Sequence, residues 1–179
     1  VIYPPVSVDD IPFNKGERNN SFLYIGRIVA YKGVDIMIKA CADLKLKLVI
    51  AGKGTDLERM KDYVISLGAE KYITFLGFVS ERQKKSLLSK SKAFIFPTKD
   101  EDFGVVPVEA NAAGTPVIAF RGGGVLESLS EKNPRTAIFF NKYSAESLKR
   151  KLKNFNRYKI IPENCRKQAK LFDKEIFIY

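Results

Sequence analysis

Short apolar runs alternate with amphipathic segments along most of the chain, and this alternation constrains the fold more than any other feature. Six runs are expected to form strands, at residues 21–26, 46–52, 72–77, 93–97, 115–120 and 136–140. Their residues are mostly apolar instead of alternating with polar ones, which is typical of strands covered on both faces. The sequence therefore predicts an α/β fold, a Rossmann-like doubly wound parallel sheet of about six strands with helices on both faces.

The segments between these runs carry helix signals. Helices are expected over about residues 33–44, from Thr55 to Gly68, from Ser80, over about 107–113, from Ser144 and after Pro162. Thr55 with Glu58 and Ser80 with Gln83 have the spacing of capping boxes. The helix that Ser144 caps is expected to carry Phe155 on its apolar face.

Composition excludes several kinds of protein. The chain has 179 residues, the size of one domain, and no apolar run approaches the roughly 20 residues of a membrane-spanning helix. Histidine is absent, which excludes His-based triads and His-ligated metal ions. Cys41 and Cys165 are too few for a metal cluster or a disulfide framework. We expect two buried thiols in a reducing, cytoplasmic setting, and no metal site.

The chain is strongly basic, with 31 Lys and Arg against 20 Asp and Glu and a net charge of +11. The excess is concentrated in residues 141–179, which contain eleven basic and four acidic residues. Such a surface favours nucleotides, phosphates, nucleic acid or an anionic membrane, and the alternative is a solvated lysine-rich face on two helices. The terminal lysines are not interleaved with aromatic residues in a nucleic-acid-binding motif, so no nucleic-acid partner is expected.

Candidate ligand-binding residues follow the predicted strands, at the edge of a doubly wound sheet where ligands bind. Gly26 and Arg27 end the first run, and Lys32 and Gly33 open the next helix. A guanidinium and an ammonium group at a helix amino terminus suit a diphosphate, although loop cations also occur without a ligand. Arg121 and the glycines at 122–124 form a second glycine-rich loop, which fits either a tight turn or a phosphate site.

Two acidic residues flank a turn after the fourth run. Glu101 lies in the loop and Glu109 on the next helix, with seven residues between them. Carboxylates accept strong hydrogen bonds from hydroxyl groups, so the pair suits a sugar. Backbone amides from Gly104 to Val106 would point at the strand ends and suit an anion or a sugar oxygen. The alternative is an exposed acidic loop and a glutamate that interacts with the helix dipole.

Five segments in order resemble the C-terminal, nucleotide-sugar-binding domain of the retaining family 4 (group 1) glycosyltransferases, which have the GT-B fold. They are VIYPPVSVDDIPF, GRIVAYKG, VIAGKG with FLGFVS, EDFGVVPVEANAAGTPVIAF and GGGVLESL, and they span nearly the whole chain. The fourth resembles the E-x7-E signature of the family and is similar to mannosyltransferases of polysaccharide and O-antigen assembly. Leu126 and Ala137 depart from the usual proline and glycine, which affects the shape of the last loop.

The resemblance implies roles for individual residues. Arg27 and Lys32 would neutralise the donor diphosphate, and Glu101 would bind hydroxyls of the transferred sugar. Glu109 would bind the ribose, and backbone groups of residues 103–106 would contact sugar and phosphate, while Phe78 and Val79 would border the base. The implied catalytic residues are Glu101, Arg27 and Lys32. The implied donor-binding residues are Gly26, Arg27, Lys32, Phe78, Val79, Phe103, Gly104, Val105, Val106 and Glu109.

The resemblance also implies a reaction and a domain organisation. A hexose such as mannose would pass, with retained configuration, from GDP-mannose or a UDP-hexose to an acceptor hydroxyl, without a cofactor. Residues 1–20 would be an interdomain linker, residues 21–160 the donor-binding domain, and residues 161–179 a helical segment returning toward an N-terminal domain. That missing domain would hold a glycan or lipid-linked acceptor, so the chain alone is expected to be inactive. The basic C-terminal helices suit a peripheral contact with an anionic membrane.

Two other functions fit the same residues. A sucrose- or glycogen-synthase-like GT-B enzyme would use a glucosyl donor at the same site. A non-catalytic nucleotide-binding or scaffolding module would instead dock its basic tail on an anionic membrane or on RNA, and that docking would survive the loss of Arg27 and Lys32.

Overall fold

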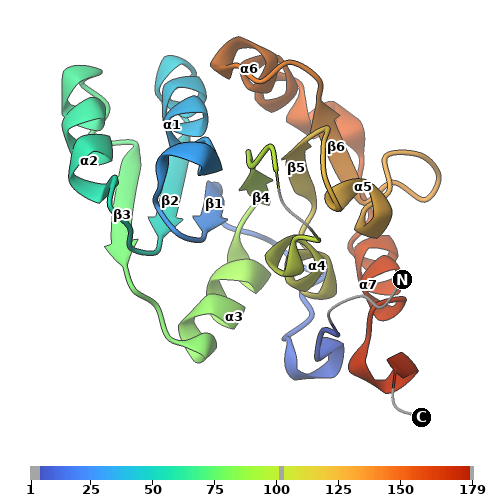
Figure 1. Ribbon diagram of the computed structural model, residues 1–179. Helices are drawn as coiled ribbons and strands as arrows, with labels where there is room; N and C mark the ends of the chain where they lie inside the picture. Colours follow the sequence, from blue (N-terminus) through green and yellow to red (C-terminus); the bar gives the residue numbers. More distant parts are fainter. Residues whose placement is uncertain (1–4, 101–102, 178–179) are drawn as a thin grey trace.

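The computed structural model describes residues 5–100 and 103–177, so the predicted site residue Glu101 lies outside the described residues. Its centre is a six-stranded parallel sheet with the strand order β3-β2-β1-β4-β5-β6 (Figure 1). The strands are β1 (Ser21–Ile25), β2 (Lys47–Ala51), β3 (Ile73–Gly77), β4 (Ala93–Phe96), β5 (Val117–Phe120) and β6 (Ala137–Phe140). The strand order reverses between β1 and β4, which makes the sheet doubly wound. The predicted fold class is confirmed.

Helices cover both faces of the sheet (Figure 1). One face carries α1 (Val34–Asp43), α2 (Leu57–Ser66) and α6 (Ala145–Lys153). The other carries α3 (Glu81–Lys90), α4 (Val105–Ala112) and α7 (Pro162–Lys170). The shorter elements are η1 (Val8–Asp10), η2 (Ala30–Lys32), α5 (Val125–Ser128), η3 (Phe155–Tyr158) and η4 (Lys174–Phe177). In the described ranges, no helix has the length and apolar character needed to cross a bilayer.

The side chains of each strand alternate between two apolar clusters. In β1, Phe22 and Tyr24 pack with α1, α2 and α6, whereas Leu23 packs with α3, α4 and α7. Both clusters exclude water, which explains why the strand runs contain few polar residues. Cys41 and Cys165 are free thiols buried in the interior. Burial raises the pKa of Cys165 to about 12, as expected for an inert thiol.

Two predicted helix starts are confirmed. The amide of Gln83 donates to Oγ of Ser80 at 3.3 Å, and Oε1 of Gln83 accepts from the amide of Ser80 at 2.8 Å. These two bonds form the capping box of α3. Ser144 caps α6 by accepting from the amide of Ser147 at 3.3 Å.

Two predicted helix details are wrong. Thr55 and Glu58 form no capping box, because the amide of Asp56 is bound to the carbonyl of Ile28 at 3.0 Å and α2 starts after Asp56. Phe155 does not belong to α6. That helix ends at Lys153, and the side chain of the following Asn154 donates to the carbonyl of Arg150 at 3.0 Å. Phe155 opens η3 instead.

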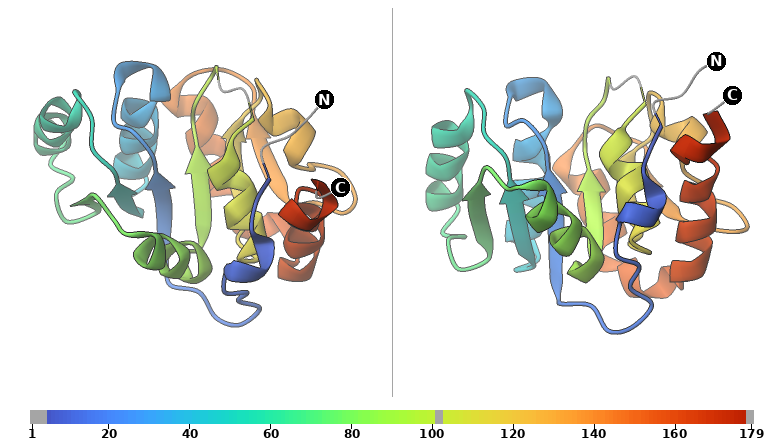
Figure 2. Two further views of the ribbon diagram at one scale, coloured as in Figure 1. Left: turned by 60° about the horizontal axis from the view of Figure 1, so that its bottom comes forward. Right: turned by 90° about the horizontal axis from the view of Figure 1, so that it is seen from below.

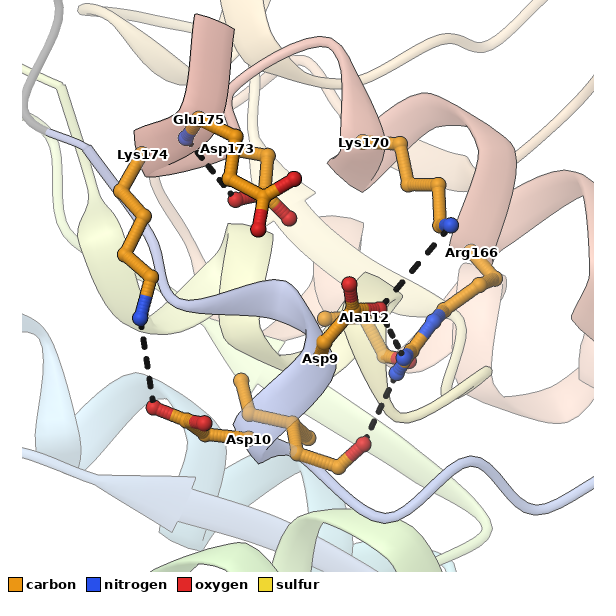
Figure 3. A network of polar contacts seen from close by, with 9 residues as sticks. Asp9, Asp10, Ala112, Arg166, Lys170, Asp173, Lys174 and Glu175 are labelled. Atoms are coloured by element: carbon orange, nitrogen blue, oxygen red, sulfur yellow. Dashed lines mark hydrogen bonds and ion pairs between the residues drawn. The ribbon is translucent and has the colours of Figure 1, made fainter. Parts of the chain in front are cut away.

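The amino-terminal segment lies beside α7, so the two ends of the described chain meet (Figure 2). Val6, Val8 and Ile11 are buried in the same apolar cluster as α4 and α7. Arg166 of α7 donates to the carbonyl of Ile11 at 2.8 Å and pairs with Asp9 at 3.1 Å (Figure 3). These contacts fix the amino-terminal segment against the domain.

Arg18 links this segment to two other parts of the chain. Its guanidinium donates to the carbonyl of Ser89 at 2.8 Å, to Oγ1 of Thr115 at 2.6 Å and to the carbonyl of Ala113 at 3.2 Å. The acceptors lie on α3 and on the connection between α4 and β5. Because the group is partly buried and bound on several sides, we infer that it stabilises the packing of α3 and α4.

Removal of the Arg18 side chain should destabilise the domain. Arg18→Ala leaves several carbonyl and hydroxyl groups without their donor, so we expect a loss of about 2–4 kcal/mol in the free energy of unfolding. Urea denaturation measures it. Lys15→Ala, at an exposed position of the same segment, should change stability by less than about 0.5 kcal/mol. Equal effects of the two substitutions would contradict this role.

Candidate functional site

A cleft of about 350 Å³ opens at the carboxyl ends of β1 and β4, where the strand order reverses. Ligands of doubly wound folds bind at this kind of position. The cleft is lined by Tyr24, Ile25, Gly26, Arg27, Lys32, Phe96, Phe103, Gly104, Val105 and Val106. The loop with the predicted cations Arg27 and Lys32 and the predicted turn before α4 therefore line the same cleft.

Two cations of the cleft contact Tyr31, a residue that is not among those predicted from the sequence. The guanidinium of Arg27 donates to the Tyr31 hydroxyl at 2.8 Å, and Nζ of Lys32 lies 5.3 Å from the centre of the Tyr31 ring. A tyrosine offers a neutral oxygen to one cation and an aromatic face to the other. The sequence feature that could have pointed to Tyr31 is its position immediately before Lys32.

A left-handed glycine sets the path of this loop. Gly33 has a φ of 68° and precedes α1. A Cβ atom there would lie 2.6 Å from Oη of Tyr143 and 3.0 Å from the carbonyl oxygen of Pro97. Only glycine fits both the backbone angle and the space, so the turn that presents Lys32 depends on it.

The other part of the cleft is the amino end of α4. Gly104 precedes this helix with a φ of 80° and provides no side-chain cap. Within residues 5–100 and 103–177, no oxygen atom accepts a hydrogen bond from the amides of Val105 and Val106. These amides and the helix dipole add positive potential to that of Arg27 and Lys32. The arrangement can bind an anion with more than one charge, such as a diphosphate.

Glu109 does not line the cleft, but it lies one turn along α4 from Val105 on the same helix face. Its Oε1 accepts from Nζ of Lys84 on α3 at 2.8 Å, and the two side chains are only 12% and 15% exposed. Its Oε2 is buried, and no partner for it is present in the described residues. One carboxylate oxygen is therefore held by a cation, while the other can still accept a hydrogen bond.

Lys84 also pairs with Glu81, at 3.0 Å. Burial lowers the pKa of Lys84, but the hydrogen bonds to Glu109 and Glu81 outweigh burial and raise this pKa above its usual value. Lys84 therefore stays charged beside Glu109. The sequence gives no sign of this pairing, because Lys84 lies 25 residues from Glu109 on a different helix.

The other predicted residues lie away from the cleft. Phe78 follows β3 with 74% of its surface exposed, and neither it nor Val79 lines the cleft. Arg121 pairs with Glu131 and donates to Oδ1 of Asn141 at 2.8 Å. It thus links the loops after β5 and β6, which supports the structural interpretation of this glycine-rich turn.

Residues 8–172 match the family described as "Glycosyl transferases group 1". The chain belongs to this family.

Similar proteins and solved structures agree with this membership. An uncharacterized glycosyltransferase of Methanocaldococcus jannaschii is 31% identical over 179 residues, which cover 98% of this chain and 50% of that protein. The O-antigen chain mannosyltransferase RfbU of Salmonella typhimurium is 34% identical over 121 residues, which cover 66% of this chain and 34% of that protein. The structure of Anabaena HepE in complex with UDP-glucose shares the fold, with a TM-score of 0.82, 20% identity and coverage of 96% of this chain and 53% of that one. The chain spans about half the length, or less, of these proteins.

Removal of Lys84 should reveal the cost of an unpaired Glu109. Lys84→Met leaves a buried carboxylate without its cation, so we expect a loss of about 2–4 kcal/mol of folding free energy. Glu81→Gln removes only the pair with a residue that is 75% exposed, and it should cost less than about 1 kcal/mol. Urea denaturation of both variants is the measurement, and a larger effect of Glu81→Gln would contradict the assignment.

Proposed function

We propose that the chain is the C-terminal, donor-binding half of a retaining family 4 glycosyltransferase with the GT-B fold. The observation that carries this proposal is that Arg27, Lys32 and the amino end of α4 line one cleft at the reversal of strand order. Three sources of positive potential in one cleft suit the diphosphate of a nucleoside-diphosphate sugar. The family membership supplies the reaction class.

The donor would lie across the cleft with its diphosphate between the cations and α4. Gly26 and the turn before α4 allow the backbone to approach the phosphates closely. The unpartnered Oε2 of Glu109 supports a hydrogen bond from a ribose hydroxyl. By resemblance, Glu101 binds the transferred hexose, and Phe78 and Val79 border the base.

Catalysis would rest on stabilisation of the leaving group. As the bond to the anomeric carbon breaks, negative charge develops on the departing diphosphate. Arg27, Lys32 and the first-turn amides of α4 would stabilise that charge, and the cleft that all of them line supports this role. The sugar then joins an acceptor hydroxyl with retained configuration, as the resemblance implies.

We further propose a hexosyl donor, with mannose preferred, and an acceptor in polysaccharide assembly. The O-antigen mannosyltransferase among the relatives supports a mannosyl donor, whereas the UDP-glucose complex of the Anabaena neighbour favours a glucosyl donor as the alternative. The acceptor, a glycan or a lipid-linked glycan, would be held by a second domain. Two free, buried thiols suit a cytoplasmic enzyme.

Nucleotide protection tests the phosphate assignment. A nucleoside diphosphate at about 100 times its dissociation constant should stabilise the fold by about 2.7 kcal/mol, which raises the melting temperature by roughly 5–10 °C. Arg27→Ala should abolish this protection. The matched control is Arg59→Ala, since Arg59 is exposed, pairs with Asp56 and does not line the cleft. Unchanged protection in Arg27→Ala would refute the assignment.

The preferred nucleotide separates the alternatives. Stronger protection by GDP-mannose than by UDP-glucose or ADP-glucose supports the mannosyl donor, and the reverse order supports a glucosyl donor. A non-catalytic module would show salt-sensitive binding to lipid or RNA that persists in Arg27→Ala. We expect the 179 residues alone to bind the donor without turnover, so repeated transfer by this chain would contradict the two-domain proposal.

A further inference from the structure

A second basic surface lies at the far edge of the sheet, next to the edge strand β6. It is built by the loops on either side of β6, by α6, and by the segment from η3 to the start of α7 (Figure 1). We call it the β6 basic face, and its residues are Lys132, Arg135, Lys142, Arg150, Lys151, Tyr158, Lys159 and Ile161. None of them lines the cleft described above.

These residues form one continuous surface. Lys142, Arg150, Lys151 and Tyr158 line a shallow hollow of about 390 Å³. Lys132, Arg135, Lys159 and Ile161 line a second hollow of about 290 Å³. Tyr158 joins the two, because its ring centre lies 5.5 Å from the guanidinium of Arg135 and 5.9 Å from Nζ of Lys151.

The positive charge of this face is not neutralised by neighbouring carboxylates. Lys149, on the adjacent side of α6, pairs with Asp43 at 3.4 Å and with Glu146 at 2.6 Å. In contrast, the six cations of the β6 basic face have no carboxylate within 4.0 Å in the part of the chain that the structure describes. Residues 147–162 contain six basic residues and no acidic one. Such an uncompensated field attracts a surface that carries many negative charges.

Tyr158 and Ile161, the two uncharged residues of the β6 basic face, indicate which kind of anionic partner binds there. Ile161 is 53% exposed among the cations, and an apolar side chain in that setting gains by entering the headgroup region of a bilayer. The Tyr158 ring is already engaged by two cations, which leaves it poorly placed to stack on a nucleic-acid base. We propose that the β6 basic face is a docking surface for anionic phospholipid membranes.

Docking there would also orient the cleft. Lys142 follows the carboxyl end of β6, and the cleft also lies at the carboxyl ends of the strands. The hydroxyl of the adjacent Tyr143 donates to the carbonyl of Tyr31 at 3.4 Å. Tyr143, the residue after Lys142 of the β6 basic face, therefore contacts the loop that carries Arg27 and Lys32. A membrane-bound acceptor would meet the transferred sugar near the bilayer, an orientation that rests on the proposed function, whereas the docking itself does not.

Vesicle binding by the 179-residue chain tests the proposal. We expect sedimentation with vesicles of phosphatidylcholine and phosphatidylglycerol, no sedimentation with phosphatidylcholine alone, and release at about 0.5 M salt. Arg150→Gln/Lys151→Gln should weaken binding by roughly 25-fold, since each basic residue near an anionic bilayer contributes about five-fold. Ile161→Ser should weaken it by roughly five-fold or more through the loss of apolar burial.

A matched double substitution on the other face of the sheet is the control. Lys85→Gln/Lys90→Gln on α3 removes the same charge, and it should change vesicle binding by less than about three-fold. Lys132→Gln/Lys159→Gln, outside any helix, should repeat the loss if the α6 variant does not fold.

Several outcomes would overturn the proposal. Equal losses in the α3 and α6 variants would mean that net charge alone causes binding. Tighter binding to RNA than to vesicles, unchanged by Ile161→Ser, would assign the face to nucleic acid. Nucleotide protection that is absent in the unsubstituted chain would contradict the proposed function alone, because Arg27 and Lys32 lie outside this face.

Discussion

Burial of the sheet on both faces is the constraint on which the rest of the structure depends. The inner residues of each strand belong to one of two apolar clusters, so polar chemistry is confined to the strand ends. The parallel arrangement gathers all carboxyl ends at one edge. The chain leaves β1 toward α1 on one face and leaves β4 toward α4 on the other. The cleft lies between the loop that follows β1 and the loop that follows β4. These two loops carry the charged and hydrogen-bonding groups of the cleft.

Positive charge is distributed unevenly over the molecule. A cation that is paired with a carboxylate contributes little to the potential outside the protein, whereas an unneutralised cation contributes fully. Lys84 is paired with Glu109, and Lys149 with Asp43, so neither contributes much to the field outside the protein. Arg27 instead donates to the neutral hydroxyl of Tyr31 and has no carboxylate partner among the described residues. The cleft and the β6 basic face therefore keep a positive potential, which favours anionic ligands over neutral ones.

The fold was predictable because burial on both faces makes every strand almost wholly apolar. The cations of the cleft were predictable because Arg27 follows β1 and Lys32 immediately precedes the turn into α1. Interactions between segments that are distant in the sequence could not be predicted. The start of α2 depends on the bond from the amide of Asp56 to the carbonyl of Ile28, which the local pattern at Thr55 cannot reveal. The pairing of Lys84 with Glu109 depends on the packing of α3 against α4, and helical spacing carries no information about it.

The placement of α4 connects the cleft to the ends of the described chain. At the carboxyl end of α4, Arg166 donates to the carbonyl of Ala112 at 2.7 Å (Figure 3). Just before the amino end, the ring of Phe103 packs against Phe172, with ring centres 5.3 Å apart. Both contacts come from α7 and the residues that follow it, and the amino-terminal segment is bonded to the same part of the chain. The groups that hold the terminal segments therefore also fix α4, whose first residues line the cleft.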